Sequence, residues 1–312
     1  MKLATRINSF LPQSKNDLNT VFEKLNHIGI NYVDLNYPEH IEKFSPEDVS
    51  TMLSENNLKL NGLALRFKDD YINGELGNAE DSIAKSAVDL CRRAIDFCRQ
   101  ANGKVVTIWL AHDGFDYSFQ INYEKVWNQL KKSFADIADY ATPDIKISIE
   151  YKPFQPRAYA FIDGMGITGM MLDELNRPNL GVTLDYCHML MKHENPAFAA
   201  DIFGKRGQLF GVHLNDGYGL NDDGLMIGTA TPVKTFEFLY YLKKNDYDNV
   251  IYFDTFPVIE NAEEECVQNI KTIKEFDKKI TETGVAKIQQ IIDQNDAIKA
   301  NELVHKLLFG CK

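Results

Sequence analysis

The feature that most constrains the fold is a repeated alternation of short apolar runs with longer segments of helical periodicity. Eight runs have the length and composition of buried strands: Lys2–Ile7, Tyr32–Leu35, Leu58–Leu65, Val105–Leu110, Ile145–Glu150, Leu180–Leu184, Leu209–His213 and Val250–Asp254. A segment with apolar residues at helical spacing follows each run: Asn16–Ile28, Ser45–Glu55, Asp81–Gln100, Tyr123–Tyr140, Gly169–Leu175, Pro196–Phe203, Val233–Lys244 and Ala262–Lys279. This order is typical of a parallel sheet whose strands are joined by helices.

Polar residues at the strand ends decide between the two common folds with this order. The last four strands lead to Glu150, Asp185, His213 and Asp254. A closed barrel brings the carboxyl ends of all its strands to one mouth, whereas an open doubly wound sheet holds some of them far apart. We therefore predict a (β/α)8 TIM barrel over residues 1–280, which would be the catalytic domain.

Residues 281–312 are expected to form a helical arm beyond the barrel. Apolar residues recur at helical spacing between Gly284 and Phe309. This pattern predicts one or two amphipathic helices with an apolar face. That face could cover the chain's own barrel or reach a neighbouring subunit, and the pattern favours neither.

Composition narrows the class of partner and the compartment. The net charge of −11 opposes binding to nucleic acid, because that affinity depends on Lys and Arg neutralising phosphates. No apolar run approaches the roughly 18 residues that a membrane span needs. The five cysteines include no CxxC pair, which is typical of reduced thiols. We expect a cytoplasmic protein that binds neither nucleic acid nor a membrane.

The four strand-end residues form a candidate metal site. Glu150, Asp185 and Asp254 offer hard oxygen ligands and His213 offers an imidazole. This set suits Mn²⁺, Mg²⁺, Co²⁺ or Zn²⁺. Burying these groups at one mouth without a cation would leave uncompensated charge, which is costly.

A second metal position can be assembled from residues that follow the same strands. His188 lies three residues after Asp185, and Asp222 and Asp223 lie in the loop after His213. In this interpretation Asp185 bridges the two metals. Asp-Gly is also a plain turn signal, and two nearby residues, Asp216 and Asn221, remain alternative ligands.

Lys152 and several aromatic residues are candidates for contact with a substrate. Lys152 lies two residues beyond Glu150, so an extended chain points both side chains to one face. We expect its amine to lie near a substrate oxygen, which makes Lys152, Glu150 and Asp254 the candidate catalytic groups. The remaining substrate-binding candidates are Trp109, Phe67 and Phe256 as an apolar wall, with His112 as a polar contact.

These motifs resemble the xylose isomerase-like TIM-barrel superfamily and, within it, the rhamnose isomerase-like and other small sugar isomerases. The segment EYKPFQPR at Glu150–Arg157 is similar to the metal-ligand and lysine segment of xylose isomerases. LDYCH at Leu184–His188 matches an acid-x-x-His pair in which the acid bridges two metals. HLND with NDDGLMIG, YFDTFP and IWLAHDGFDY resemble the later ligand strands and the tryptophan strand of the same enzymes.

The resemblance implies a metal-dependent aldose–ketose isomerase. Its substrate would be a free, unphosphorylated sugar such as a pentose, branched pentose or deoxyhexose. Two divalent metals, most often Mn²⁺, would assist a hydride shift between C1 and C2, while Lys152 stabilises the charge on the carbonyl oxygen. Enzymes of this group are usually homodimers or homotetramers.

One departure from the pattern limits the resemblance. Xylose isomerases carry a histidine after an early strand for ring opening, whereas LALRFKDD offers Arg66, a further candidate for substrate binding. The alternative function is a ketose 3-epimerase or hydroxypyruvate isomerase, in which two glutamates exchange a proton with carbon. The shorter side chain of Asp254, together with Lys152 and His188, favours isomerisation. A sugar-binding barrel without catalysis should lack a complete ligand set.

Overall fold

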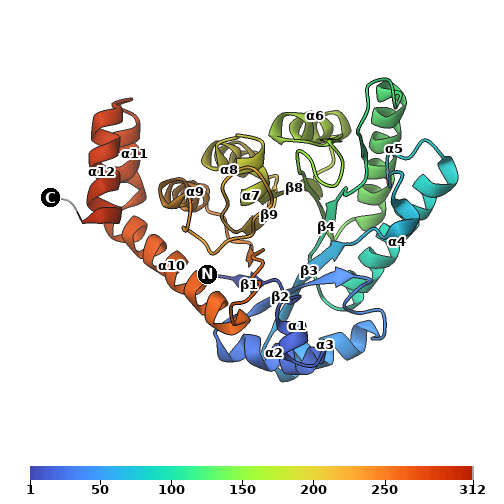
Figure 1. Ribbon diagram of the computed structural model, residues 1–312, viewed down its shortest axis with the longest axis horizontal. Coiled ribbons are helices and arrows are strands. Elements are labelled where there is room, and N and C mark those ends of the chain that lie inside the picture. The colour runs from blue at the N-terminus through green and yellow to red at the C-terminus, as the bar shows by residue number, and fades with distance from the viewer. Residues whose placement is uncertain (311–312) are drawn as a thin grey trace.

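The computed structural model describes residues 1–310. Eight parallel strands form one sheet in the order β1-β10-β9-β8-β6-β4-β3-β2. Their bounds are β1 Leu3–Thr5, β2 Tyr32–Tyr37, β3 Lys59–Leu65, β4 Val105–Trp109, β6 Lys146–Glu150, β8 Leu180–Asp185, β9 Leu209–Leu214 and β10 Ile251–Phe253. The sheet curls into a nearly closed barrel surrounded by helices (Figure 1). The predicted (β/α)8 barrel is confirmed.

The barrel closes between β1 and β2 through Asn31 rather than through a regular ladder. The backbone N–H of Leu3 donates to Oδ1 of Asn31 at 3.0 Å, and the N–H of Asn31 donates to the carbonyl of Leu3 at 3.4 Å. These bonds join the amino-terminal ends of the first and second strands, which therefore lie side by side.

Helices cover the outside of the barrel. Their bounds are α1 Phe10–Gln13, α2 Leu18–His27, α3 Pro46–Glu55, α4 Asp81–Gln100, α5 Tyr123–Ala141, α6 Met165–Leu175, α7 Tyr186–Met191, α8 Pro196–Lys205, α9 Pro232–Lys244 and α10 Ala262–Thr283, with a 3₁₀ turn at Asp69–Tyr71. Local signals set several starts: Ser45 and Asp48 form a capping box at α3, and Asn195 caps α8 ahead of Pro196.

Two features escaped the sequence patterns because they are short. The strands β5 (Gly114–Phe115) and β7 (Tyr159–Ala160) pair antiparallel in the loops after β4 and β6. The helix α7 begins directly at the end of β8, without an intervening loop. Elements of this length carry too few residues for a periodicity to show.

The core lies mainly between the strands and the surrounding helices. Val106 and Ile108 of β4 are fully buried, and Phe134 and Ile137 of α5 belong to the same cluster. Burying one such side chain contributes about 1.5–3 kcal/mol. Polar residues also lie inside the barrel, where the hydroxyl of Thr183 in β8 shares hydrogen bonds with those of Ser148 in β6 and Thr107 in β4. The interior face of the strands is therefore the face that leads to the polar mouth.

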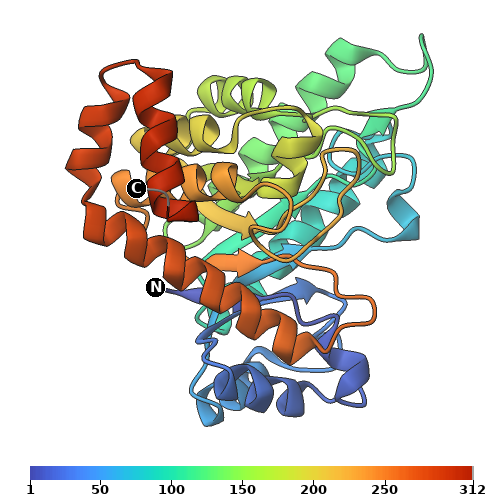
Figure 2. The same ribbon diagram turned by 60° about the vertical axis from the view of Figure 1, so that its left-hand side comes forward.

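The residues of the predicted arm form two helices, α11 (Val285–Ile292) and α12 (Ala297–Phe309). The pair stands at one side of the molecule, beyond the end of α10 (Figures 1 and 2). Helix α11 packs against α10 and α9, with Ile288 buried and the Tyr240 hydroxyl 2.8 Å from Oε1 of Gln289. Helix α12 packs on α11 and has no buried residue. The arm thus covers its own barrel through α11.

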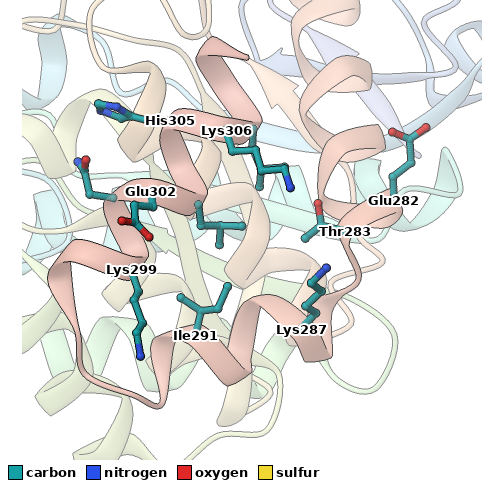
Figure 3. A pocket seen from close by; sticks show the side chains of 11 residues that line it. Glu282, Thr283, Lys287, Ile291, Lys299, Glu302, His305 and Lys306 are labelled. Carbon is teal, nitrogen blue, oxygen red and sulfur yellow. The ribbon is translucent and has the colours of Figure 1, made fainter. Parts of the chain in front are cut away.

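A groove on this arm is larger than the cavity at the barrel mouth. Figure 3 shows this groove of about 870 Å³ between the end of α10, α11 and α12. Its wall includes Lys287, Lys299, Glu302 and Lys306, none of which is buried. The lining residues of this groove form no buried polar cluster, whereas the strand ends carry buried acidic and histidine side chains.

Within the described residues, no helix is both long enough and apolar enough to cross a membrane.

Candidate metal centre

Four strand ends bring the first set of predicted ligands together. Glu150 ends β6, Asp185 ends β8, His213 lies in β9 and Asp254 follows β10. Asp185 is the register partner of His213 in the β8–β9 ladder, so both side chains point into the barrel. One ligand atom from each of the four residues lies within 4.8 Å of the others. Residues far apart in the chain therefore form one compact donor set.

The unsatisfied atoms of this set fit a divalent cation. All four residues are buried. Nδ1 of His213 and Oδ1 of Asp254 are buried and have no hydrogen-bond partner among residues 1–310. Nδ1 of His213 lies 3.3 Å from Oε2 of Glu150 and 4.0 Å from Oδ2 of Asp185. Buried groups without partners are costly unless a ligand satisfies them.

The carboxyl groups respond differently to this crowding. Burial opposes ionisation of Glu150, but neighbouring His213 outweighs it and lowers the pKa of Glu150 to about 2. Burial raises the pKa of Asp185 to about 7, although the charge of His188 opposes this shift. Within the first donor group, three carboxyl groups lie around a single imidazole.

The two histidines take up protons in place of a cation. Burial alone would lower the pKa of His188 and His213. The adjacent carboxylates, Asp185 for His188 and Glu150 for His213, reverse the effect and raise each pKa to about 9. A metal supplies the same positive charge and requires neutral imidazoles, so it would replace these protons.

A second donor group is built around Asp185. Asp185 is the N-cap of α7, and its Oδ1 accepts the backbone N–H of His188 at 3.0 Å. Nδ1 of His188 donates to the carbonyl of Tyr151 at 3.0 Å, because a carbonyl can only accept. Nε2 is then the ligand atom of the neutral ring, and it lies 3.2 Å from Oδ2 of Asp222. Ligand atoms of Asp185, His188 and Asp222 lie within 4.8 Å of one another.

Cys187 holds the loop that presents Asp222. Its Sγ lies 3.3 Å from the carbonyl of Asn221 and accepts the N–H of Asp223 at 3.3 Å. The next residue, Gly224, has a φ of +56°, and a Cβ there would lie 2.4 Å from the ring of Phe256. A glycine is therefore required for the loop to pack against the end of the eighth barrel strand.

The other acidic candidates of this loop are occupied elsewhere. Oδ2 of Asp223 accepts the N–H of Tyr218 at 2.7 Å. Asp216 is fully buried, and its carboxylate accepts the N–H groups of Gly217, Ala230 and Thr231. The side-chain oxygen of Asn221 accepts from Gln155 at 3.2 Å. Asp222 is therefore the loop residue that the structure brings to the second donor group.

Lys152 lies two residues after Glu150, beyond the end of β6, and both side chains line the same cavity. It is 7% exposed, and its Nζ donates to Oδ2 of Asp222 at 2.8 Å. The amine also lies 5.2 Å from the ring centre of Trp109. A buried ammonium held at this place can reach an oxygen atom that lies beside the second donor group.

A cavity of about 200 Å³ opens above both donor groups. It is lined by Arg6, Arg66, Trp109, Glu150, Lys152, His188, Asp222, Asp254 and Phe256. Two predicted substrate contacts, His112 and Phe67, are not among these residues. The carbonyl of His112 accepts from Arg157 at 3.4 Å, and Phe67 packs edge-on against Tyr71.

Arg6 is a site residue that the sequence patterns did not identify. It directly follows β1, and its guanidinium lies 4.4 Å from the ring centre of Phe256. Its sequence signal is its position directly after the first strand, equivalent to that of the later strand-end ligands.

Solved structures with the same architecture come from sugar epimerases and related proteins. A D-allulose 3-epimerase from Methylomonas sp. in complex with D-allulose has 18% identity and a TM-score of 0.70, with 82% of this chain and 90% of that chain covered. A D-tagatose 3-epimerase-like protein has 21% identity and a TM-score of 0.69, covering 91% and 99%. The IolI protein with a bound zinc atom has 17% identity and a TM-score of 0.70, covering 88% and 98%. At these identities the likeness shows the fold.

A family model supplies the more specific result. The model of the xylose isomerase-like TIM barrel matches residues 22–276, which include every barrel strand except β1 and all the residues of the two donor groups. The predicted resemblance is thereby confirmed, and the chain belongs to the xylose isomerase-like TIM-barrel family.

Proposed function

We propose that this protein is a metal-dependent isomerase that interconverts the aldose and ketose forms of a free sugar. The observation that carries the proposal is the second donor group, which shares Asp185 with the first and lies directly beside Lys152. One metal is enough to hold a sugar through two oxygens. A second site next to a buried amine suits a reaction in which charge moves between adjacent sugar oxygens.

The first donor set would hold one cation and Asp185, His188 and Asp222 the other. When bound, the metals supply Lewis acidity and a template for adjacent oxygens. Lys152 donates to the oxygen on which negative charge develops, a contribution that typically amounts to about 10²–10³ in rate. The rings of Trp109 and Phe256 wall the cavity and keep water from the reacting carbons.

Epimerisation is the second candidate function, because the similar structures named above include a D-allulose 3-epimerase and a D-tagatose 3-epimerase-like protein. An epimerase of that type needs two carboxylates that reach the substrate carbon from either side. Glu150 and Asp254 occupy the corresponding strand ends here. The aspartate has one methylene fewer than a glutamate, so its reach is shorter, and this favours isomerisation.

We propose Mn²⁺ as the working metal, with Mg²⁺, Co²⁺ and Zn²⁺ as alternatives, because three carboxylates dominate the first donor set. The proposal includes two ions per subunit, a cytoplasmic location and a homodimeric or homotetrameric assembly. Metal analysis of protein refilled with each ion, together with sedimentation, tests the stoichiometry and the assembly.

The mechanism is tested by following the fate of hydrogen at carbon. EDTA-treated protein is refilled with Mn²⁺ and incubated in deuterated water with free pentoses, branched pentoses, tetroses and deoxyhexoses, and NMR records the products. Aldose–ketose conversion with little deuterium at carbon is expected for a hydride shift. Conversion with full deuterium incorporation would instead establish proton abstraction and move the epimerase assignment to first place.

A further inference from the structure

The cavity at the barrel mouth has a second wall that the metal chemistry does not use. Arg6 follows β1 and Arg66 follows β3, so the two residues flank the end of β2. Both line the cavity of about 200 Å³, together with Lys152. Three cationic side chains in a cavity of this size exceed what neutral sugar hydroxyls require.

Neither guanidinium group makes a hydrogen bond within residues 1–310, and only that of Arg6 has a carboxylate, Asp254, at ion-pair distance. Nε of Arg6 is buried and has no acceptor among residues 1–310. Its ion pair with Oδ1 of Asp254 is 3.9 Å long, which is longer than a hydrogen bond. For Arg66, the residues up to 310 provide no carboxylate at ion-pair distance, and the guanidinium lies 5.6 Å from the ring centre of Trp109. Partly buried donors without acceptors indicate a ligand that accepts.

The unpartnered atoms around the cavity sort into two kinds. Oδ1 of Asp222, Oδ1 of Asp254 and Nδ1 of His213 are acceptors on the metal side. Nε of Arg6 and Nε1 of Trp109 are donors, and both residues line the same cavity. Cations satisfy the first group of atoms. Acceptor oxygen atoms, such as those of a bound molecule, satisfy the second group.

The two arginines converge at the end of β2, close to His40. Burial lowers the pKa of His40 to about 4; Glu39 opposes this shift, while the charges of Arg66 and Arg6 add to it. Nδ1 of His40 accepts the N–H of Asn36 at 3.0 Å, so the proton of the neutral ring is on Nε2. That Nε2 is also buried without a partner in residues 1–310. The neighbourhood of the arginines therefore contains a further unused donor.

Charge balance leads to the same conclusion. With two divalent cations bound, the four carboxylates of the donor groups are compensated and the ligating histidines are neutral. The charges of Arg6, Arg66 and Lys152 then remain at the mouth without carboxylates to offset them. Partly buried positive charge of this kind favours an anionic ligand.

We propose that the substrate of this site is an anionic sugar, a polyhydroxy aldehyde or ketone that ends in a carboxylate, and that Arg6 and Arg66 bind this carboxylate. The inference rests on the proposed isomerase function and specifies its substrate class. Guanidinium groups match the planar, two-oxygen geometry of a carboxylate. Phosphate sites in proteins commonly use backbone N–H groups of glycine loops or helix ends, and the residues that line this cavity include no glycine.

The test compares three unreactive ligands that share one polyol chain: xylitol, xylonate and the monophosphate of xylitol. None has a carbonyl group that could react. Isothermal titration measures their Kd for wild-type protein in the Mn²⁺-loaded and EDTA-treated forms. We expect xylonate to bind at least about tenfold more tightly than xylitol in the loaded form, with a preference that weakens as salt rises.

Variants separate the arginines from the metals as the source of this preference. Arg6→Gln and Arg66→Gln are each expected to weaken xylonate binding about tenfold and to leave xylitol binding within about twofold. Arg6→Lys and Arg66→Lys keep the charge and should retain part of the preference if folding is intact. Arg93→Gln changes the net charge equally at an exposed position on α4 and should change neither Kd.

Each other outcome overturns the inference in a distinct way. Equal Kd values for xylitol and xylonate would refute the proposal that the substrate is anionic. If the protein also converts a neutral sugar, the proposed isomerase function is retained. A xylonate preference that survives both glutamine variants places the carboxylate on the metals. If the monophosphate of xylitol binds about tenfold more tightly than xylonate, the anionic group of the substrate is a phosphate and not a carboxylate. Wild-type protein that binds neither Mn²⁺ nor any of the three polyols would refute the proposed function itself.

Discussion

This barrel contains two clusters of buried carboxyl groups, which are stabilised in different ways. One is the loop carboxyl pair, Glu75 and Asp113, in the loops after β3 and β4. The other is the set of strand-end ligands around Asp185. In the loop pair, both oxygens of Asp113 accept backbone N–H groups at 2.9 Å. In the metal centre, Asp254 Oδ1 has no partner among residues 1–310.

The loop carboxyl pair is stabilised by amides and by a proton. Burial and the nearby charge of Asp113 raise the pKa of Glu75 to about 9. Its Oε1 accepts the N–H of His112 at 2.8 Å. Its Oε2 is buried without a partner among residues 1–310, so this oxygen is free to carry the proton. The comparison teaches that a free oxygen on a buried carboxylate indicates a metal where it converges with other acidic groups and an imidazole, as at the strand ends.

The largest expected effect separates the two clusters by metal binding. Asp185→Asn removes the ligand common to both donor groups, so we expect metal binding to fail and kcat to fall about a thousandfold, equivalent to about 4 kcal/mol. Asp113→Asn should reduce stability by about 1–3 kcal/mol and leave metal affinity unchanged. Metal titration and kinetics on both variants check this. Loss of metal affinity in Asp113→Asn would contradict the conclusion that the loop carboxyl pair plays no part in metal binding.

Lys152 provides the second comparison, because its ammonium contacts the Asp222 carboxylate and also lines the cavity in which we propose that the substrate binds. Lys152→Met removes the ammonium from the cavity, and we expect kcat to fall about a hundredfold with the fold intact. Metal affinity should be kept or increased, because Asp222 loses a competing cation. A change confined to KM would show that Lys152 contributes only to ground-state binding.

Metal addition should stabilise the protein through one cluster only. A ligand that binds the folded state alone contributes about 2.7 kcal/mol at a hundredfold excess over its Kd. We expect this increment when Mn²⁺ is added to EDTA-treated wild-type protein or to Asp113→Asn. Denaturant unfolding with and without Mn²⁺ measures it. An equal increment in Asp185→Asn would place the ion elsewhere.

The loop carboxyl pair should determine part of the pH dependence of stability. The pKa of Glu75 is raised from an ordinary value of 4.5 to about 9, so between these pH values the folded state holds a proton that the unfolded state has lost. Stability therefore falls as pH rises through this window, by up to about 1.4 kcal/mol per pH unit.

Glu75→Gln tests this smallest effect. Glutamine keeps an acceptor for the N–H of His112 but cannot ionise, so the variant should lose stability less steeply between pH 5 and pH 8, as expected from the titration window of about 4.5 to 9. Denaturant unfolding of both proteins at several pH values measures the two slopes. Identical slopes would mean that Glu75 is ionised in the folded protein.

The strand ends were predictable because local patterns report them directly. Apolar runs of five or six residues followed by a single acid or histidine placed Glu150, Asp185, His213 and Asp254 without knowledge of their neighbours. The pair Asp185 and His188 is equally local, since an N-cap and the third residue of a helix are adjacent in space. The first donor group and two members of the second, Asp185 and His188, rest on such patterns.

The other residues of the site could not be assigned from the sequence, because their positions depend on contacts between distant segments. Which of Asp216, Asn221, Asp222 and Asp223 joins the site depends on Cys187 docking the loop and on backbone N–H groups that occupy Asp216. Likewise, Arg6 and Arg66 face one cavity only because β1 closes against β2 through Asn31. The positions of Arg6 and Arg66 in the sequence do not indicate that both residues line the same cavity.

The sequence by itself therefore determined the alternation of strands and helices, the barrel class and the residue types at each strand end. These properties follow from period-two and period-3.6 patterns, which act over a few residues. The tertiary structure alone decided which carboxylates keep unpaired oxygens, which are satisfied by amides, and that two arginines share the cavity. Those properties depend on hydrogen bonds and burial contributed by the whole barrel, which no local pattern contains.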